Sequence, residues 1–66
     1  MRENLKRLRK SLDLTQKEMA NLMECSRTFY GAIEKGNRNC SQTKWDNLQI
    51  ALKIPDEEMY LLIKKQ

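Results

Sequence analysis

One segment of the sequence carries start and stop signals for two short helices with almost no chain between them. Thr15 and Glu18 have the spacing of a capping box, in which each side chain satisfies a free amide of the first helical turn. Ser26 is a second N-cap candidate, and Gly36 is the residue type that ends helices in the left-handed conformation. Only residues 24–25 remain for the connection. The segment therefore predicts a helix–turn–helix, with the two helices at a steep angle.

The residue types favour helix throughout the 66-residue chain. Valine is absent and Ile and Thr together number seven, whereas Leu, Met, Lys, Glu and Gln are frequent. The sequence has no useful run in which apolar and polar residues alternate with period two, as they do in strands, and it has no repeat and no low-complexity tract. We therefore expect an all-α fold, a compact five-helix domain that occupies residues 1–66 as a single unit. The expected helices are 2–12, 15–23, 27–35, 41–52 and a last one that starts at about Pro55.

Charge and the missing residue types narrow the class of protein. Thirteen Lys or Arg against nine Asp or Glu give a net charge of +4, which suits an anionic partner, nucleic acid ahead of a membrane surface, although solubility alone would also explain it. Histidine is absent, and Cys25 and Cys40 lack the paired spacing of metal ligands. We expect two free thiols, no metal, no cofactor and no enzymatic activity. Without a targeting segment or a bilayer-spanning stretch, the expected location is the cytoplasm, with no membrane partner.

Apolar spacing predicts which faces are buried. Leu5, Leu8 and Leu12 recur at helical spacing and form the apolar stripe of the first helix. Arg2 and the other basic residues of that helix lie mostly off the stripe, on a face that is either solvated or directed at an anionic partner. Gly31 lies inside the third helix and costs about 1 kcal/mol relative to Ala, so close packing or a closely approaching ligand should favour its missing side chain.

The helix–turn–helix resembles the lambda-repressor-like (XRE-like) family, the Cro and repressor type of bacterial and phage regulators. The matching stretches are Leu14-Thr15-Gln16-Lys17-Glu18-Met19-Ala20, then Ser26-Arg27, then Ile33-Glu34-Lys35-Gly36. Leu48, Leu52 and Ile54 fit the fourth-helix pattern of the family, so the resemblance covers about residues 4–55. It implies a DNA-binding domain in which the helix over 27–35 is the recognition helix and enters the major groove.

The resemblance places four residues of the recognition helix at the DNA bases. Arg27 and Thr28 occupy its first exposed turn, where Arg can bond bidentately to guanine and Thr offers a hydroxyl and a methyl group. A phosphate contact is the alternative for Arg27. Ala32, one turn later, can offer only apolar contact, for example to a thymine methyl. Phe29 lies between two faces and either packs on the core or contacts a thymine methyl or a sugar edge.

Other residues are expected at the DNA backbone or in the scaffold. Gln16 stands where the family has a glutamine that contacts a phosphate; the alternative is an ordinary polar surface residue. Further phosphate contacts, which position the protein without specifying sequence, are expected from Lys17, Lys35, Asn37, Arg38 and Asn39. Arg9 and Glu34 match two positions that form an ion pair in some members of the family, and we assign both to the scaffold.

The sequence departs from the family pattern near the turn. Glu24 stands where the family often has glycine, because that residue tends to adopt a positive φ. Glutamate there implies strain of about 1–3 kcal/mol or a differently shaped turn. Cys40 replaces a frequent proline, and the pair Tyr30–Gly31 replaces a more usual Ile–Ser. These changes bear on the geometry of the recognition helix rather than on the fold.

We interpret the chain as a transcriptional regulator that binds double-stranded DNA in a sequence-specific manner. We expect a repressor that binds a near-palindromic operator as a homodimer. The expected dimer surface is the last helix, around the apolar pair Tyr60 and Leu61 together with Lys64. Two alternatives remain open. One is an antitoxin that uses the same fold and a second surface to bind a toxin. The other is a protein-binding helical module without a DNA role, anchored by Phe29 or by Tyr60 and Leu61; the sequence does not identify a protein partner.

Overall fold

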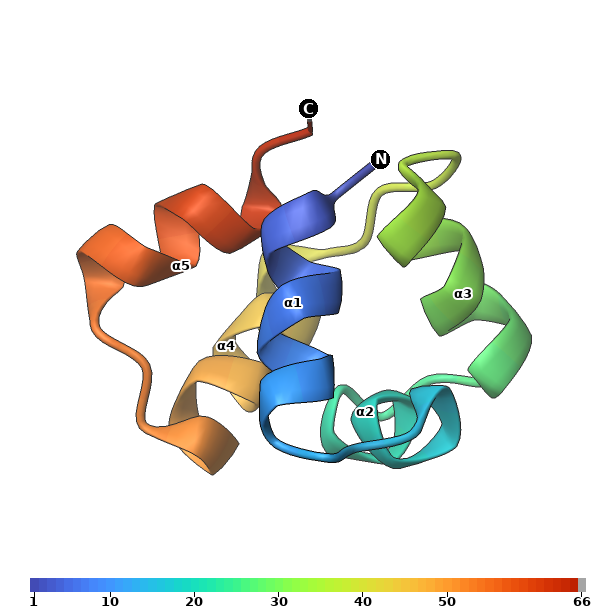
Figure 1. Ribbon diagram of the computed structural model, residues 1–66, viewed down its shortest axis with the longest axis horizontal. Helices are drawn as coiled ribbons and strands as arrows, with labels where there is room; N and C mark the ends of the chain where they lie inside the picture. Colours follow the sequence, from blue (N-terminus) through green and yellow to red (C-terminus); the bar gives the residue numbers. More distant parts are fainter. Residues whose placement is uncertain (66) are drawn as a thin grey trace.

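The computed structural model describes residues 1–65, which form five helices and no strand (Figure 1). In chain order the helices are α1 (Glu3–Ser11), α2 (Gln16–Leu22), α3 (Arg27–Lys35), α4 (Gln42–Leu52) and α5 (Asp56–Ile63). Figure 1 shows α1 in the middle of the molecule, with α3 on one side, α5 on the other and α2 near the end of α1. The expected all-α, five-helix fold is confirmed, and α3 has the expected bounds.

Local signals in the sequence set the helix ends. The capping box of α2 is complete, because the Glu18 amide donates to Thr15 Oγ1 (3.1 Å) and the Thr15 amide donates to Glu18 Oε1 (2.8 Å). Ser26 caps α3 by accepting a hydrogen bond from the amide of Phe29. Gly36 ends α3 with φ +83°, the left-handed conformation that glycine adopts without strain.

The core lies between the five helices, and every helix contributes to it. Its buried members are Leu5, Met19, Ala20, Met23, Tyr30, Ile33, Trp45, Leu48, Ile54, Met59 and Leu62. Helices α2 and α3 pack on each other more extensively than any other pair. Helix α1 packs on α3 and α4 packs on α2, whereas α5 packs on α1 and α4. The opposite face of α3 remains exposed.

Two sequence predictions about helix ends are wrong. Leu12 was expected on the buried stripe of α1, but the helix ends at Ser11 and the Leu12 side chain is 45% exposed. Leu14, on the following loop, packs against the core. Pro55 was expected in the first turn of α5, but its ψ of 154° is extended and it occupies the N-cap position.

Arg2 is the largest departure from the expected surface. Instead of facing solvent or a partner, it is only 2% exposed. Its guanidinium donates hydrogen bonds to the carbonyl oxygens of Ile63, Ile33 and Arg38 and to Oδ1 of Asn39. It also lies over the Trp45 ring, 5.5 Å from the centroid. The last carbonyls of a helix carry partial negative charge, so the ends of α3 and α5 help to satisfy this buried cation.

The turn between α2 and α3 contains a glutamate in the left-handed conformation. Glu24 has φ +56°, so the turn keeps the positive φ that glycine would supply, with the strain that a side chain adds. Helix α4 holds this residue in place. Lys44 Nζ donates to the Glu24 carbonyl oxygen (3.0 Å), and Asn47 Nδ2 donates to Glu24 Oε2 (2.8 Å).

Candidate nucleic-acid interface

The outer face of α3 is basic and carries small side chains at its middle. Arg27, Thr28 and Lys35 are exposed, and Gly31 and Ala32 are half-buried. Residues three or four apart lie on the same side of a helix, so Arg27, Gly31 and Lys35 form one row beside Thr28 and Ala32. The two small residues therefore leave a low stretch between the long side chains at the two ends of the helix.

This low stretch is the floor of a shallow hollow of about 320 Å³. Its lining residues come from α3, from the first residue of α2 and from the loop after α3: Arg27, Thr28, Gly31, Ala32, Lys35, Gln16 and Asn37. The lining contains two cations, two side-chain amides and a hydroxyl, but no carboxylate. Such a surface suits an anionic partner that presents hydrogen-bond acceptors.

A second, larger hollow adjoins the first at the start of α2. It is lined by Arg9, Lys10, Asp13, Leu14, Thr15, Gln16, Lys17 and Arg27. Gln16 and Arg27 line both hollows, so the two form one continuous surface that reaches from Lys10 to Lys35. Lys10 is one of the basic residues of the first helix for which the sequence leaves a solvated face and an anionic partner equally open, and the fold brings it beside α2.

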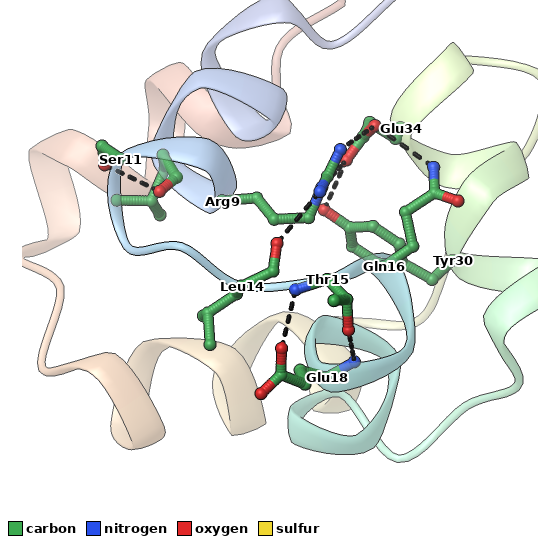
Figure 2. A network of polar contacts seen from close by, with 9 residues as sticks. Arg9, Ser11, Leu14, Thr15, Gln16, Glu18, Tyr30 and Glu34 are labelled. Atoms are coloured by element: carbon green, nitrogen blue, oxygen red, sulfur yellow. Dashed lines mark hydrogen bonds and ion pairs between the residues drawn. The ribbon is translucent and has the colours of Figure 1, made fainter.

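A buried polar network lies beneath this surface and centres on the Glu34 carboxylate (Figure 2). Arg9 Nε donates to Glu34 Oε2 at 2.9 Å, which forms the ion pair between α1 and α3. The Tyr30 hydroxyl donates to the same oxygen at 2.8 Å, and Gln16 Nε2 donates to Oε1 at 3.4 Å. Arg9 also donates to the Leu14 carbonyl oxygen. The network thus joins α1, α2 and α3 through Arg9, Gln16 and Glu34.

The charges in this network are fixed at neutral pH. Burial acts to raise the pKa of Glu34, but hydrogen bonds from Arg9 and Tyr30 outweigh it and hold that pKa below its ordinary value. The hydrogen bond with Glu34 raises the pKa of Arg9. Burial, followed by the contact with Glu34, raises the pKa of Tyr30 far above its ordinary value, so its hydroxyl remains a donor. A carboxamide NH₂ has two donors, and one of them on Gln16 remains for a ligand.

Comparison with known proteins shows the family to which the chain belongs. Residues 5–59 match the family described as helix-turn-helix. The chain belongs to this family. It is also 36% identical over 63 residues to the control protein C.MunI of a Mycoplasma species, a match that covers 94% of this chain and 85% of that protein. No solved structure matches it.

As a member of the helix-turn-helix family, the protein is a DNA-binding transcriptional regulator. The family is one of regulators and not of enzymes. Within residues 1–65, no cluster of three or more His, Cys, Asp or Glu side chains is placed to hold a metal ion. Cys25 and Cys40 are free thiols, and burial raises the pKa of each. In the same part of the chain, no helix is long and apolar enough to cross a membrane.

The helix-turn-helix brings most of the predicted DNA-contacting residues together, but not all. Phe29 is half-buried and packs against the core, which is the first of the two alternatives that its position in the sequence leaves open. Asn37 and Arg38 are exposed on the loop after α3, whereas the Asn39 side chain accepts a hydrogen bond from Arg2. Phe29, Arg38 and Asn39 line neither hollow.

Proposed function

We propose that this regulator reads duplex DNA with α3 in the major groove. The observation that carries the proposal is the exposure of Arg27 and Thr28 in the first turn of α3, above a buried network that fixes the position of the helix. Arg27 is suited to a guanine edge, and Thr28 and Ala32 to neighbouring bases or thymine methyl groups. The similarity to a protein named a control protein supports a regulatory role, and we place the protein in the cytoplasm as a repressor.

Backbone contacts would fix the protein on the duplex. We assign phosphates to the side chains around α3, namely Gln16, Lys17, Lys35, Asn37, Arg38 and Asn39, and we add Lys10 because it borders the same surface. For Asn39 the expected group is its amide NH₂, since its Oδ1 already accepts from Arg2. These residues carry no sequence information directly, so their loss should weaken all DNA sites alike.

A second copy of the chain would place two recognition helices on one operator. The outer face of α5 carries Glu57, Tyr60 and Leu61, and the C-cap residue Lys64 follows them, so that the four have the spacing i, i+3, i+4 and i+7 of a single helical stripe. Tyr60 is 66% exposed and Leu61 48% exposed. If two copies of α5 pack antiparallel about an axis between residues 60 and 61, Glu57 of each faces Lys64 of the other. This self-complementary pattern supports a two-fold dimer.

Binding to duplex DNA at a series of salt concentrations tests the proposal. The logarithm of the association constant should fall linearly with the logarithm of salt concentration, with a slope of about −0.9 per phosphate contacted. Selection of bound sites from random duplexes should then yield two inverted half-sites about 10–10.5 base pairs apart, or a multiple of that spacing. Lack of binding to any duplex at low salt would refute the function proposed.

A further inference from the structure

Gly31 is a glycine that nothing inside the described chain requires. A Cβ built on it would meet only the side-chain amide of Gln16, at 3.8 and 3.9 Å, which is ordinary van der Waals contact. Close packing, one of the two reasons expected for a glycine here, is therefore excluded. Gly36 differs, because its φ of +83° disfavours any other residue.

A glycine in the interior of a helix weakens that helix relative to alanine. Gly31 lies in the middle of α3 and in helical conformation, so alanine would fit the backbone and reduce the freedom of the unfolded chain. The fold alone would favour alanine at this position. The remaining reason for glycine is a partner that comes close to the backbone of α3.

The surroundings of Gly31 indicate which part of a DNA duplex that partner would be. Gln16 and Lys35, both assigned to phosphates above, line the hollow together with Gly31, and the lining contains no carboxylate. A bare Cα offers no hydrogen-bonding group that would distinguish one base from another. A sugar-phosphate segment needs only room and nearby positive or donor groups, and the hollow supplies both.

From these observations we infer that a backbone phosphate of the DNA packs against Gly31 between Gln16 and Lys35, so that a side chain at position 31 would hold the duplex off the recognition helix. The inference rests on the proposed function and adds a residue that acts by its lack of a side chain. It predicts opposite effects on stability and on DNA affinity. Alanine at position 31 should stabilise the fold and weaken DNA binding.

Gly31→Ala and Gly31→Val test this inference in the full chain. Thermal unfolding and binding would be measured with two probes, a random-sequence duplex at low salt and a site selected from random duplexes with the wild-type protein. The melting temperature of Gly31→Ala should rise by about 4–8 °C. Its affinity for both duplexes should fall by about tenfold, and that of Gly31→Val should fall further.

Ala51→Gly is the matched control, since it exchanges the same two residues at an exposed position of α4 outside both hollows. It should lower the melting temperature and leave affinity unchanged. A Gly31→Ala protein that is stabilised and binds both duplexes as tightly as wild type would overturn the inference. So would a loss confined to one base pair of the selected site, which would assign Gly31 to a base. Failure of the wild-type protein to bind any duplex would instead refute the proposed function itself.

Discussion

The guanidinium of Arg2 donates a 2.7 Å hydrogen bond to the carbonyl oxygen of Ile33, in the last turn of α3. The same guanidinium donates to the Ile63 carbonyl oxygen at the end of α5, and the backbone amide of Arg2 donates to the Glu34 carbonyl oxygen. One residue near the start of the chain therefore fastens the end of α3 to the end of α5, the helix proposed to form the dimer.

Arg2→Ala should lower the free energy of unfolding by about 3 kcal/mol, because it removes the donors to the partly buried carbonyl oxygens of Ile63 and Arg38 and the cation above Trp45. Urea unfolding would measure the change. Arg7→Ala is the control: Arg7 lies in α1, directly after the N-cap residue Arg2 and the first turn of that helix, carries the same charge and is exposed. Its loss should change the free energy of unfolding by less than about 0.5 kcal/mol. Equal losses in the two variants would show that the Arg2 contacts contribute nothing beyond charge.

Arg2 also illustrates what the sequence leaves open. The caps at Thr15, Ser26 and Gly36 were predictable, because each depends on hydrogen bonds to residues only a few positions away. The partners of Arg2 lie 31 to 61 residues along the chain. Residue type favoured an exposed arginine, and no local pattern signals that two helix ends will converge on it.

Some features of the candidate site are predictable from local sequence, and others depend on how the helices pack. The exposure of Arg27 and Thr28 follows from helical periodicity and from the N-cap that precedes them. The position of Lys10 beside α2 depends on how α1 and α2 pack, which the sequence does not encode locally. The contact between Gln16 and Glu34 joins two helices for the same reason. Whether these residues touch DNA stays a prediction.

The free energy of unfolding should decrease as pH falls below about 4.5, the ordinary pKa of a glutamate. The folded-state pKa of Glu34 lies below this value, so its contribution is fully present above pH 4.5 and is lost as pH falls through the folded pKa. Glu18, whose pKa is lowered by its bonds to Thr15, acts in the same direction. Urea unfolding between about pH 3 and pH 7, which spans the ordinary pKa of a glutamate, would measure the dependence.

Glu34→Gln isolates the part of this pH dependence that belongs to the buried network. The free energy of unfolding of this variant should be lower than that of wild type by about 3 kcal/mol at neutral pH, because Arg9 loses its ionic partner. Its stability should then vary less with acid than that of wild type, with Glu18 contributing to the remainder. A variant with the same dependence on pH as wild type would contradict the assignment to Glu34.

Arg27→Ala should weaken binding to the selected site by about 1–3 kcal/mol and relax the preference at a single base pair, if Arg27 bonds to guanine. Competition binding with a set of single-base-pair variants of that site would measure both effects. Gln16→Ala is the comparison, since it removes a proposed phosphate contact at the junction of the same two hollows. It should weaken every variant similarly. A uniform loss for Arg27→Ala as well would assign Arg27 to a phosphate.

The proposed dimer predicts a charge reversal that is harmful alone and repaired in combination. In the antiparallel arrangement Glu57→Lys places two like charges opposite each other twice, once on each side of the two-fold axis, and Lys64→Glu does the same with the opposite sign. Each single variant should therefore weaken dimerisation several-fold, as expected for exposed ion pairs at low salt. The double variant restores both pairs with their signs exchanged and should recover the affinity of wild type. Sedimentation equilibrium would measure all three.

Glu58→Lys supplies the control for this series, because it makes the same change of charge one residue further along α5, away from the stripe of Glu57, Tyr60, Leu61 and Lys64. It should dimerise like wild type, since its side chain points about 100° away from that of Glu57 around the helix. If Glu58→Lys weakened the dimer as much as Glu57→Lys, net charge and not pairing would explain the loss. If the double variant failed to recover, Glu57 and Lys64 would not face each other, and the two copies would have to pack with another register or through another surface.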